Sequence, residues 1–197
     1  MTLTVTVMRD YMFLFLFSLV TGRSLAQPYD WLIRGGTVID PKNGIHKQLD
    51  IAVKDGVIAR VERNIPVEQA SRVIQARGLY VTPGLIDLHT HLFTGPERNK
   101  FANGSNSLSP DEFSFRSGVT TMVDAGTAGP ANFLRFKEQV IDASATRVLA
   151  FLNIAADGLS GKPGQEDLGL MSIDSALARM KQFPEQIVGI KLSLIHI

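Results

Sequence analysis

The chain has 197 residues, with 20 basic and 19 acidic side chains and a formal charge of +1. This balance, without a basic run interleaved with aromatic residues, gives no sign of a nucleic-acid-binding protein. Cysteine is absent, which excludes disulfides, thiolate metal sites and a cysteine nucleophile. A transition metal would therefore have to be held by histidine, carboxylate or a modified lysine.

Residues 1–26 are predicted to be a signal peptide. Arg9 precedes a short apolar segment, and Ser24 and Ala26 supply the small residues of a cleavage site before Gln27. The apolar segment is shorter than the roughly 20 residues that a membrane-spanning helix needs. We expect an exported protein, periplasmic or secreted, with no membrane association once the signal is removed. A buried N-terminal helix is the alternative interpretation.

Residues 27–82 are predicted to form a small β-layer. Short alternating runs are separated by turn residues, and Asp55-Gly56 between two such runs is a strong hairpin signal. A β-layer of about 50 residues would be marginal alone, so we expect another part of the chain to cover it. His46 lies beside a turn in this layer and is interpreted as a surface residue.

Residues 83–191 change to a rhythm of strand followed by helix. The strand-like stretches are GLIDLHTHLF, VTTMVDAG, TRVLAFLNIA and QIVGIK, and the helical ones are SPDEFSFR, PANFLRFKEQVIDAS and SIDSALARMKQF. Ser109 and Ser172 are the expected N-cap residues of the first and last helices. Such alternation predicts an α/β architecture with a parallel sheet. A closed (β/α)₈ barrel needs roughly 200 residues or more, so this region would hold only strands 1–4 of a barrel.

Two long loops, residues 94–108 and 155–170, follow the first and third of these strands. Both would lie at the carboxyl ends of parallel strands, where the active sites of α/β barrels are built. The alternative is that they are ordinary surface loops.

The segment Asp87-Leu88-His89-Thr90-His91 is the main chemical signal. In a strand, alternate residues share a face, so Asp87, His89 and His91 are expected to point the same way. Two imidazoles about 7 Å apart along one face can converge on one metal ion. Asp87 is a candidate to orient a ligand histidine, or to contact substrate. Core packing is the alternative explanation of a lone His-x-His pattern.

The stretches GLYVTPGLIDLHTHLFTG, GVTTMVDAGTAGPANFLRF, RVLAFLNIA and IVGIK together resemble the amidohydrolase superfamily. The similarity spans residues 31–191 and is strongest to its amidohydrolase/deacetylase branch, which is related to dihydroorotase and N-acyl amino-acid deacylases. The resemblance implies a β-sandwich built from both chain ends beside a (β/α)₈ barrel. Residues 27–82 would then be the N-terminal part of the sandwich.

The resemblance also implies a binuclear metal centre of two divalent ions, which we expect to be zinc. His89 and His91 match the two ligands of the first strand, and Lys191 matches the lysine that is carboxylated by CO₂ and bridges both metals. A free ammonium would repel two cations, whereas its carbamate is an anionic oxygen ligand. Two further histidines and the aspartate that acts as general base belong to later strands and are expected beyond this chain.

Departures from the family pattern narrow the range of possible substrates. Dihydroorotase-like members carry an arginine two residues after the second histidine, where this chain has Phe93. The cysteine-bridged D-aminoacylase variant is excluded because cysteine is absent. Asn153 is a candidate to contact the substrate or to support a ligand, and Asp124 could line the site. Both are equally compatible with ordinary strand-end roles.

The expected function is a metal-dependent hydrolase of amide or ester bonds, a deacetylase that uses a metal-bridging hydroxide on a small acylated molecule. The alternatives are a cyclic-amide hydrolase, resembling dihydroorotase or hydantoinase, and a non-catalytic scaffold with the same fold. The full-length protein could form a homo-oligomer. Residues 1–197 alone, half a barrel with open sheet edges, are expected to be inactive.

Residues 192–197 are expected to be non-native. The sequence Leu-Ser-Leu-Ile-His-Ile is what a common sequencing-library adapter encodes in frame. Lys191 would then be the last native residue, and His196 is given no role.

Overall fold

The computed structural model describes residues 27–93, 107–159 and 168–192. The predicted signal peptide, most of the loop after the first parallel strand, and residues 193–197 lie outside this part of the chain. The chain divides into two compact units, Met1–Thr82 and Pro83–Ile197. Within the described residues, no helix is long and apolar enough to cross a membrane.

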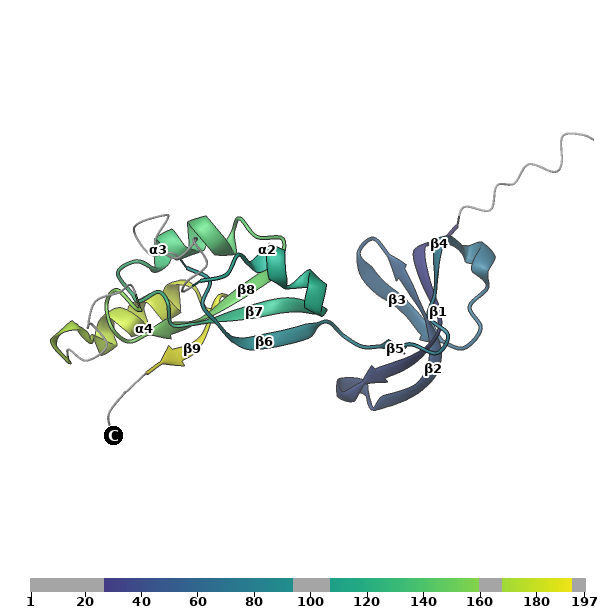
Figure 1. Cartoon of the computed structure of the whole chain (residues 1–197), viewed down its shortest axis with the longest axis horizontal. Coiled ribbons are helices and arrows are strands. Elements are labelled where there is room, and N and C mark those ends of the chain that lie inside the picture. Colours follow the sequence, from purple (N-terminus) through teal and green to yellow (C-terminus); the bar gives the residue numbers. More distant parts are fainter. Residues whose placement is uncertain (1–26, 94–106, 160–167, 193–197) are drawn as a thin grey trace, which may run out of the picture. The chain divides into compact units, whose positions relative to one another are not determined.

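The first unit is a mixed sheet of five strands in the order β3-β2-β1-β4, with β5 also paired to β1 (Figure 1). Strands β1, β2 and β3 form an antiparallel meander, whereas β4 and β5 run parallel to β1. The strands are β1 Tyr29–Asp40, β2 Ile45–Lys54, β3 Val57–Glu62, β4 Ala70–Gln75 and β5 Tyr80–Val81, with 3₁₀ turns η1 Pro41–Asn43 and η2 Val67–Gln69.

The hairpin expected at Asp55-Gly56 is confirmed, since it joins the antiparallel pair β2 and β3. Asp55 and Gly56 have φ values of 51° and 76°, the left-handed conformation that a tight two-residue hairpin requires at both central positions. Glycine adopts this conformation at no steric cost, and aspartate is among the residues that tolerate it.

A buried carboxylate fixes the irregular part of the first sheet. Strand β1 has a register shift between Ile33 and Gly36, so its ladder with β2 is interrupted there. Asp50 accepts hydrogen bonds from the Gly35 N–H at 2.7 Å and the Ile65 N–H at 2.9 Å. The first bond satisfies a backbone donor at the irregularity, and the second satisfies a donor in the loop after β3. Both compensate for burying the Asp50 carboxylate.

One layer gives the first unit only a thin core. Its buried side chains form two small clusters: Leu32, Ala52, Ile65 and Ala70 in one, and Val38, Leu49 and Ile51 in the other. Large apolar side chains stay exposed, including Val57 at 65% and Ile58 at 66%. This agrees with the expectation that a lone layer of this size needs a covering element.

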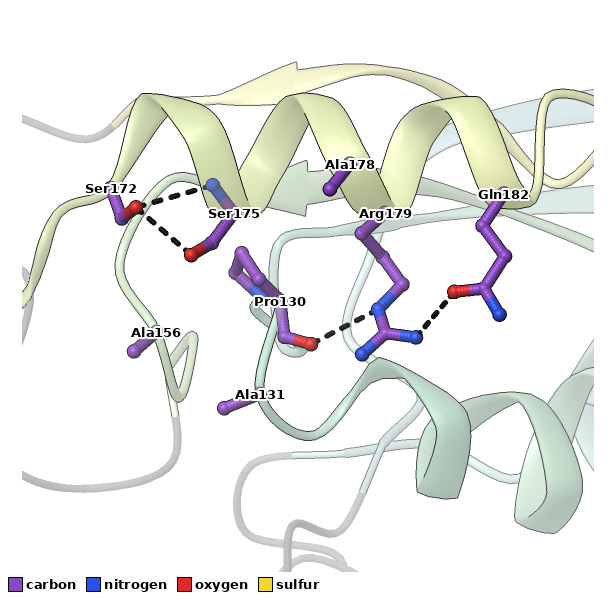
Figure 2. A pocket seen from close by; sticks show the side chains of 8 residues that line it. All are labelled: Pro130, Ala131, Ala156, Ser172, Ser175, Ala178, Arg179 and Gln182. Carbon is purple, nitrogen blue, oxygen red and sulfur yellow. Dashed lines mark hydrogen bonds between the residues drawn. The ribbon is translucent and has the colours of Figure 1, made fainter.

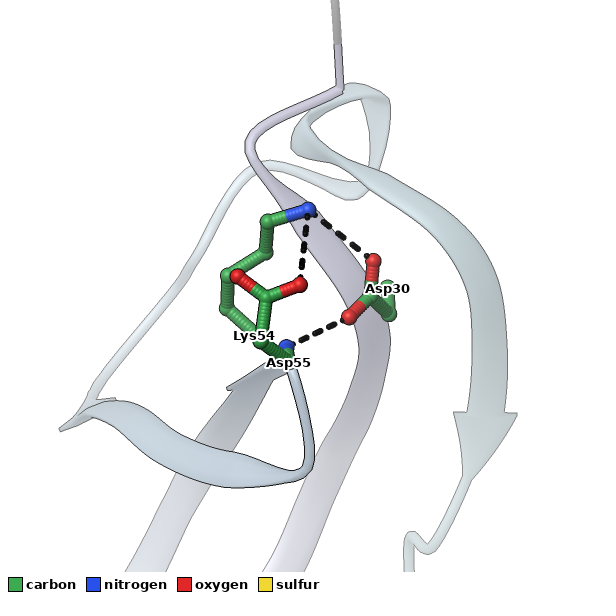
Figure 3. Close-up of polar contacts among 3 residues, drawn as sticks. All are labelled: Asp30, Lys54 and Asp55. Carbon is green, nitrogen blue, oxygen red and sulfur yellow. Dashed lines mark hydrogen bonds and ion pairs between the residues drawn. The ribbon is translucent and has the colours of Figure 1, made fainter.

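Asp30, at the start of β1, fastens that strand to the β2–β3 hairpin (Figure 3). Its carboxylate accepts from the Asp55 N–H at 2.7 Å and pairs with the Lys54 ammonium at 3.2 Å. The hydrogen bond from Asp55 and the contact with Lys54 hold the pKa of Asp30 below its ordinary value.

We predict that Asp30→Asn lowers the thermal unfolding midpoint of the full-length protein at pH 7, by a few degrees at most because the pair is exposed. A carboxylate with a lowered pKa stabilises the fold above its unfolded pKa of about 3.8 and loses this effect as the pH falls through the folded value. The difference between variant and parent should therefore shrink at pH 3. Melting curves at both pH values, with the exposed Glu68→Gln as control, check this. An equal difference at pH 7 and pH 3 would contradict it.

The second unit is a four-stranded parallel sheet in the order β6-β7-β8-β9 (Figure 1). The predicted α/β class is confirmed for this unit. The strands are β6 Leu85–Thr90, β7 Val119–Ala125, β8 Arg147–Asn153 and β9 Ile187–Lys191. The helical elements are α2 Pro110–Phe113, η3 Phe115–Ser117, α3 Phe133–Phe136, the π-turn η4 Lys137–Ile141, η6 Leu168–Leu170 and α4 Ile173–Gln182.

Both predicted N-cap residues occupy the N-cap positions. Ser172 caps α4, since its hydroxyl accepts from the Ser175 N–H at 3.2 Å. Ser109 is the N-cap residue of α2, but its side chain makes no capping hydrogen bond. The start of α2 is instead tied down by Asp111, whose carboxylate accepts from the backbone N–H groups of Ala145 and Thr146 just before β8.

The helices pack on one face of this sheet through an aromatic core. The rings of Phe93 and Phe136 lie 5.4 Å apart, and those of Phe133 and Phe183 lie 5.3 Å apart. The core also includes alternate residues of β8, namely Val148, Ala150 and Leu152. Because strand side chains alternate, the opposite face of β8 is free to line a site at its carboxyl end.

Candidate metal centre at the carboxyl edge of the parallel sheet

His89 and His91 lie at the carboxyl end of β6. Their rings are 5.6 Å apart between centroids and nearly perpendicular, at 81°. His89 is exposed and His91 is half-buried. Two imidazoles at this separation can converge on one ion, as the sequence spacing predicts.

The strict alternation expected from Asp87 to His91 is interrupted. The step from Asp87 to Thr90 along β6 is three residues, whereas the facing step from Met122 to Asp124 along β7 is two. Such a bulge reorients the following side chains, so alternation no longer fixes which of them share a face with Asp87, whose register partner is Met122. The Asp87 carboxylate accepts from the backbone N–H of His89 at 3.1 Å, which fixes the backbone of the His-x-His segment.

His91 is held from the loop after β7. Its Nδ1 is 3.1 Å from the Thr127 hydroxyl. Burial lowers the pKa of His91, Asp124 opposes this shift, and His89 and Lys191 lower the pKa further. The last two contributions show that His91 lies within electrostatic reach of both His89 and Lys191.

Asp124 is a fully buried carboxylate at the end of β7. Its oxygens accept from the Leu92 N–H at 2.8 Å and the Thr127 N–H at 2.7 Å. Burial raises its pKa, and the hydrogen bonds from Leu92 and Thr127 and the charge of His91 act in the opposite direction. Asp124 therefore joins the end of β6 to the loop after β7 rather than lining open space.

Lys191 ends β9 and lies beside Asn153 of β8 in the register. A register shift between Ala150 and Phe151 leaves an extra residue in β9, so Ile187 pairs with Ala150 on the helix face while Lys191 follows the face of Asn153. The Lys191 stem passes over Gly126 at the end of β7: a Cβ added to Gly126 would lie 2.5 Å from Lys191 Cγ.

Asn153 is fully buried and both ends of its amide are used by the backbone. Its Nδ2 donates to the Gly126 carbonyl at 3.0 Å, and its Oδ1 accepts from the Ala155 N–H at 3.0 Å. These contacts tie the loop after β7 to the loop after β8, directly below Lys191. The sequence offered Asn153 as a substrate contact, but the contacts made here support the backbone.

Phe93 stands where dihydroorotase-like sequences have a substrate-binding arginine. It is fully buried and packs against Phe136 in the helix-covered core. Its side chain therefore belongs to the fold, and this position supplies no cation to the site.

The side chains of His89, His91 and Lys191 fit part of the ligand set of a metal centre. Within the described ranges, no three His, Cys, Asp or Glu side chains gather closely enough to hold an ion. The two imidazoles and Lys191 would be the share of the ligands that the first and fourth parallel strands contribute, with nitrogen donors and a modifiable amine that suit zinc.

A cavity of about 400 Å³ lies elsewhere, between α4 and the loop after β7 (Figure 2). Its lining is Pro130, Ala131, Ala156, Ser172, Ser175, Ala178, Arg179 and Gln182. The Arg179 guanidinium already donates to the Pro130 carbonyl and to the Gln182 side chain, so it braces the loop against the helix. None of the three candidate ligands lines this cavity.

We predict that Gly126→Ala weakens zinc binding by the full-length protein about 10–100-fold, because the new Cβ would displace the Lys191 stem. Gly118→Ala is a matched control: its φ of +73° is as unfavourable for alanine as the +85° of Gly126, but nothing lies within 4 Å of its added Cβ. Both variants carry the cost of an unfavourable φ, and only Gly126→Ala should lose metal. Competition titrations with a chelator measure this, and equal zinc affinity in the two variants would contradict it.

No family model matches the chain. It is 36% identical over 147 residues to a deacetylase of Agrobacterium fabrum, a match that covers 73% of this chain and 34% of that protein. It is 35% identical over 153 residues to a deacetylase of Brucella anthropi, covering 75% of this chain and 36% of the other. The chain thus spans about a third of the length of these curated relatives.

Among solved structures, the chain is similar to the crystal structure of a dihydroorotase. The TM-score is 0.66 at 31% sequence identity, and the superposition covers 81% of this chain and 41% of the dihydroorotase.

Proposed function

The chain belongs to the amidohydrolase superfamily, and we propose that the whole protein is a metal-dependent hydrolase of amide or ester bonds. Its substrate would be a small acylated molecule, and its reaction a deacetylation. The deacetylase relatives support this reaction. A non-catalytic scaffold is less well supported, because His89, His91 and Lys191 are all present.

The two units fit into this proposal as parts of a larger fold. The parallel sheet β6 to β9 would be the first half of a (β/α)₈ barrel, and the five-stranded sheet would be part of a β-sandwich. The exposed apolar residues of the first unit, such as Val57 and Ile58, support a missing second layer. The dihydroorotase chain is more than twice as long as the part of it that this chain matches. This supports both the half-barrel and the partial sandwich assignments.

The observation that carries the proposal is the position of the Lys191 stem. Flat sheets place neighbouring strands about 4.8 Å apart, so the first and fourth strands would be about 14 Å apart. The Lys191 stem nevertheless lies over Gly126 at the end of the second strand, and its charge lowers the pKa of His91. A curved sheet that brings these residues together is what a barrel site requires.

We assign His89 and His91 as imidazole ligands and Lys191, as its CO₂-derived carbamate, as the bridging ligand of two divalent ions, which we expect to be zinc. When bound, such ions would polarise the carbonyl under attack and lower the pKa of the attacking water. The Lys191 ammonium is a cation, which repels protonated histidine. Its carbamate would be an anion, which attracts metal ions. Asp87 would hold the backbone of the His-x-His segment during the reaction.

A cyclic-amide hydrolase is the second candidate, favoured by the dihydroorotase-like fold. Phe93 argues against it, since its buried ring leaves no guanidinium to hold a substrate carboxylate at that position. Turnover of N-acetylated amino acids, compared with turnover of dihydroorotate and hydantoins, separates the two.

We also propose that the protein is exported to the periplasm or secreted after cleavage before Gln27. N-terminal sequencing of the protein recovered from cell fractions tests this, and an intact Met1 on a cytoplasmic protein would contradict it.

We predict that the full-length protein carries two zinc ions per chain and that His91→Ala lowers hydrolysis at least about 100-fold, since one ligand of the centre is removed. His46→Ala removes an exposed histidine of the first unit and should leave both properties unchanged. Elemental analysis and steady-state assays measure this. A full-length protein without bound zinc would refute the hydrolase proposal.

A further inference from the structure

The Thr127 hydroxyl forms a hydrogen bond with the ring of His91, which is a candidate metal ligand. The sequence suggested Asp87 as the group that orients a ligand histidine, but the Asp87 carboxylate binds the His89 backbone. Thr127 is only 1% exposed, so its hydroxyl must find its partners within the protein. One partner is Nδ1 of His91 at 3.1 Å.

The direction of this hydrogen bond follows from the ring nitrogen that a metal would use. A hydroxyl has one proton to donate and two lone pairs that accept, so Thr127 can serve either form of Nδ1. Because Thr127 occupies Nδ1, Nε2 is the ring nitrogen left to bind a metal. The backbone of Thr127 is itself fixed, since its N–H donates to the fully buried Asp124 carboxylate at 2.7 Å.

An imidazole that offers its Nε2 lone pair to a metal carries its proton on Nδ1 and donates from there, so the Thr127 oxygen then accepts. A threonine hydroxyl would thus take the place that a carboxylate or a backbone carbonyl has beside the ligand histidines of zinc proteins.

We infer that Thr127 is a positioning residue, whose hydroxyl holds His91 in the Nδ1–H tautomer so that Nε2 faces the metal centre. This rests on the proposed function, because it takes His91 to be a ligand. It adds a contact to the centre from the loop after β7, which the ligand pattern alone does not include.

The test uses the full-length protein and two substitutions. Thr127→Val keeps the shape and the backbone N–H to Asp124 but removes the hydroxyl, whereas Thr127→Ser keeps the hydroxyl. Zinc affinity is measured by competition with a chromophoric chelator. We expect Thr127→Val to bind zinc about 10–100-fold more weakly, as is usual when a group that orients a ligand is lost. Thr127→Ser should bind it as the parent does.

A second readout does not depend on metal. Long-range ¹H–¹⁵N correlation spectra of the metal-free protein, labelled at histidine, report which ring nitrogen of His91 carries the proton. The Nδ1–H tautomer in the parent and in Thr127→Ser supports the inference, even if Thr127→Val does not fold.

The Nε2–H tautomer in the parent, or parental zinc affinity in a folded Thr127→Val, would overturn it. If the parent binds no zinc at all, the proposed function fails, while the tautomer still decides the role of Thr127.

Discussion

The buried carboxylate of Asp124 is the constraint on which the candidate centre depends. Removing a charge from water is costly unless hydrogen bonds replace the lost solvation. Here the donors are the backbone N–H groups of Leu92 and Thr127, which come from the ends of two different strands. Satisfying the carboxylate therefore fixes these two segments relative to each other. Because His91 precedes Leu92 directly and binds Thr127, its position follows from the same requirement.

The class of the second unit could be predicted from sequence because its signals are local. Apolar runs of strand length alternate with amphipathic stretches, and the first strand ends in His-x-His. The bulges could not be predicted. The extra residues in β6 and β9 arise from pairing with β7 and β8, and a shift of one residue moves following side chains to the other face. Alternation alone therefore cannot fix which side chains share a face across these bulges.

The same holds for the candidate site: the sequence indicates the residue types at the strand ends, but only the folded structure shows their contacts. Asn153 was selected as a polar residue at a strand end, a position that site residues and structural residues share. Its amide is consumed by the Gly126 carbonyl and the Ala155 N–H, which only the folded loops reveal. Thr127 was missed, although one signal was present: Asp124 precedes it by three residues, the spacing at which a carboxylate caps a backbone N–H after a strand.

Gly126 leaves the space that Lys191 needs at the edge of the sheet where His89 and His91 lie. Its φ of +85° suits glycine, and the missing side chain leaves room for the Lys191 stem to lie across the end of β7. The positive charge of Lys191 lowers the pKa of His91, although burial is the larger cause of that shift. Under the proposed function, a carbamate on Lys191 would replace this positive charge by an anion, so that the chemistry of one side chain, rather than a rearrangement of the sheet, would prepare this edge to bind metal.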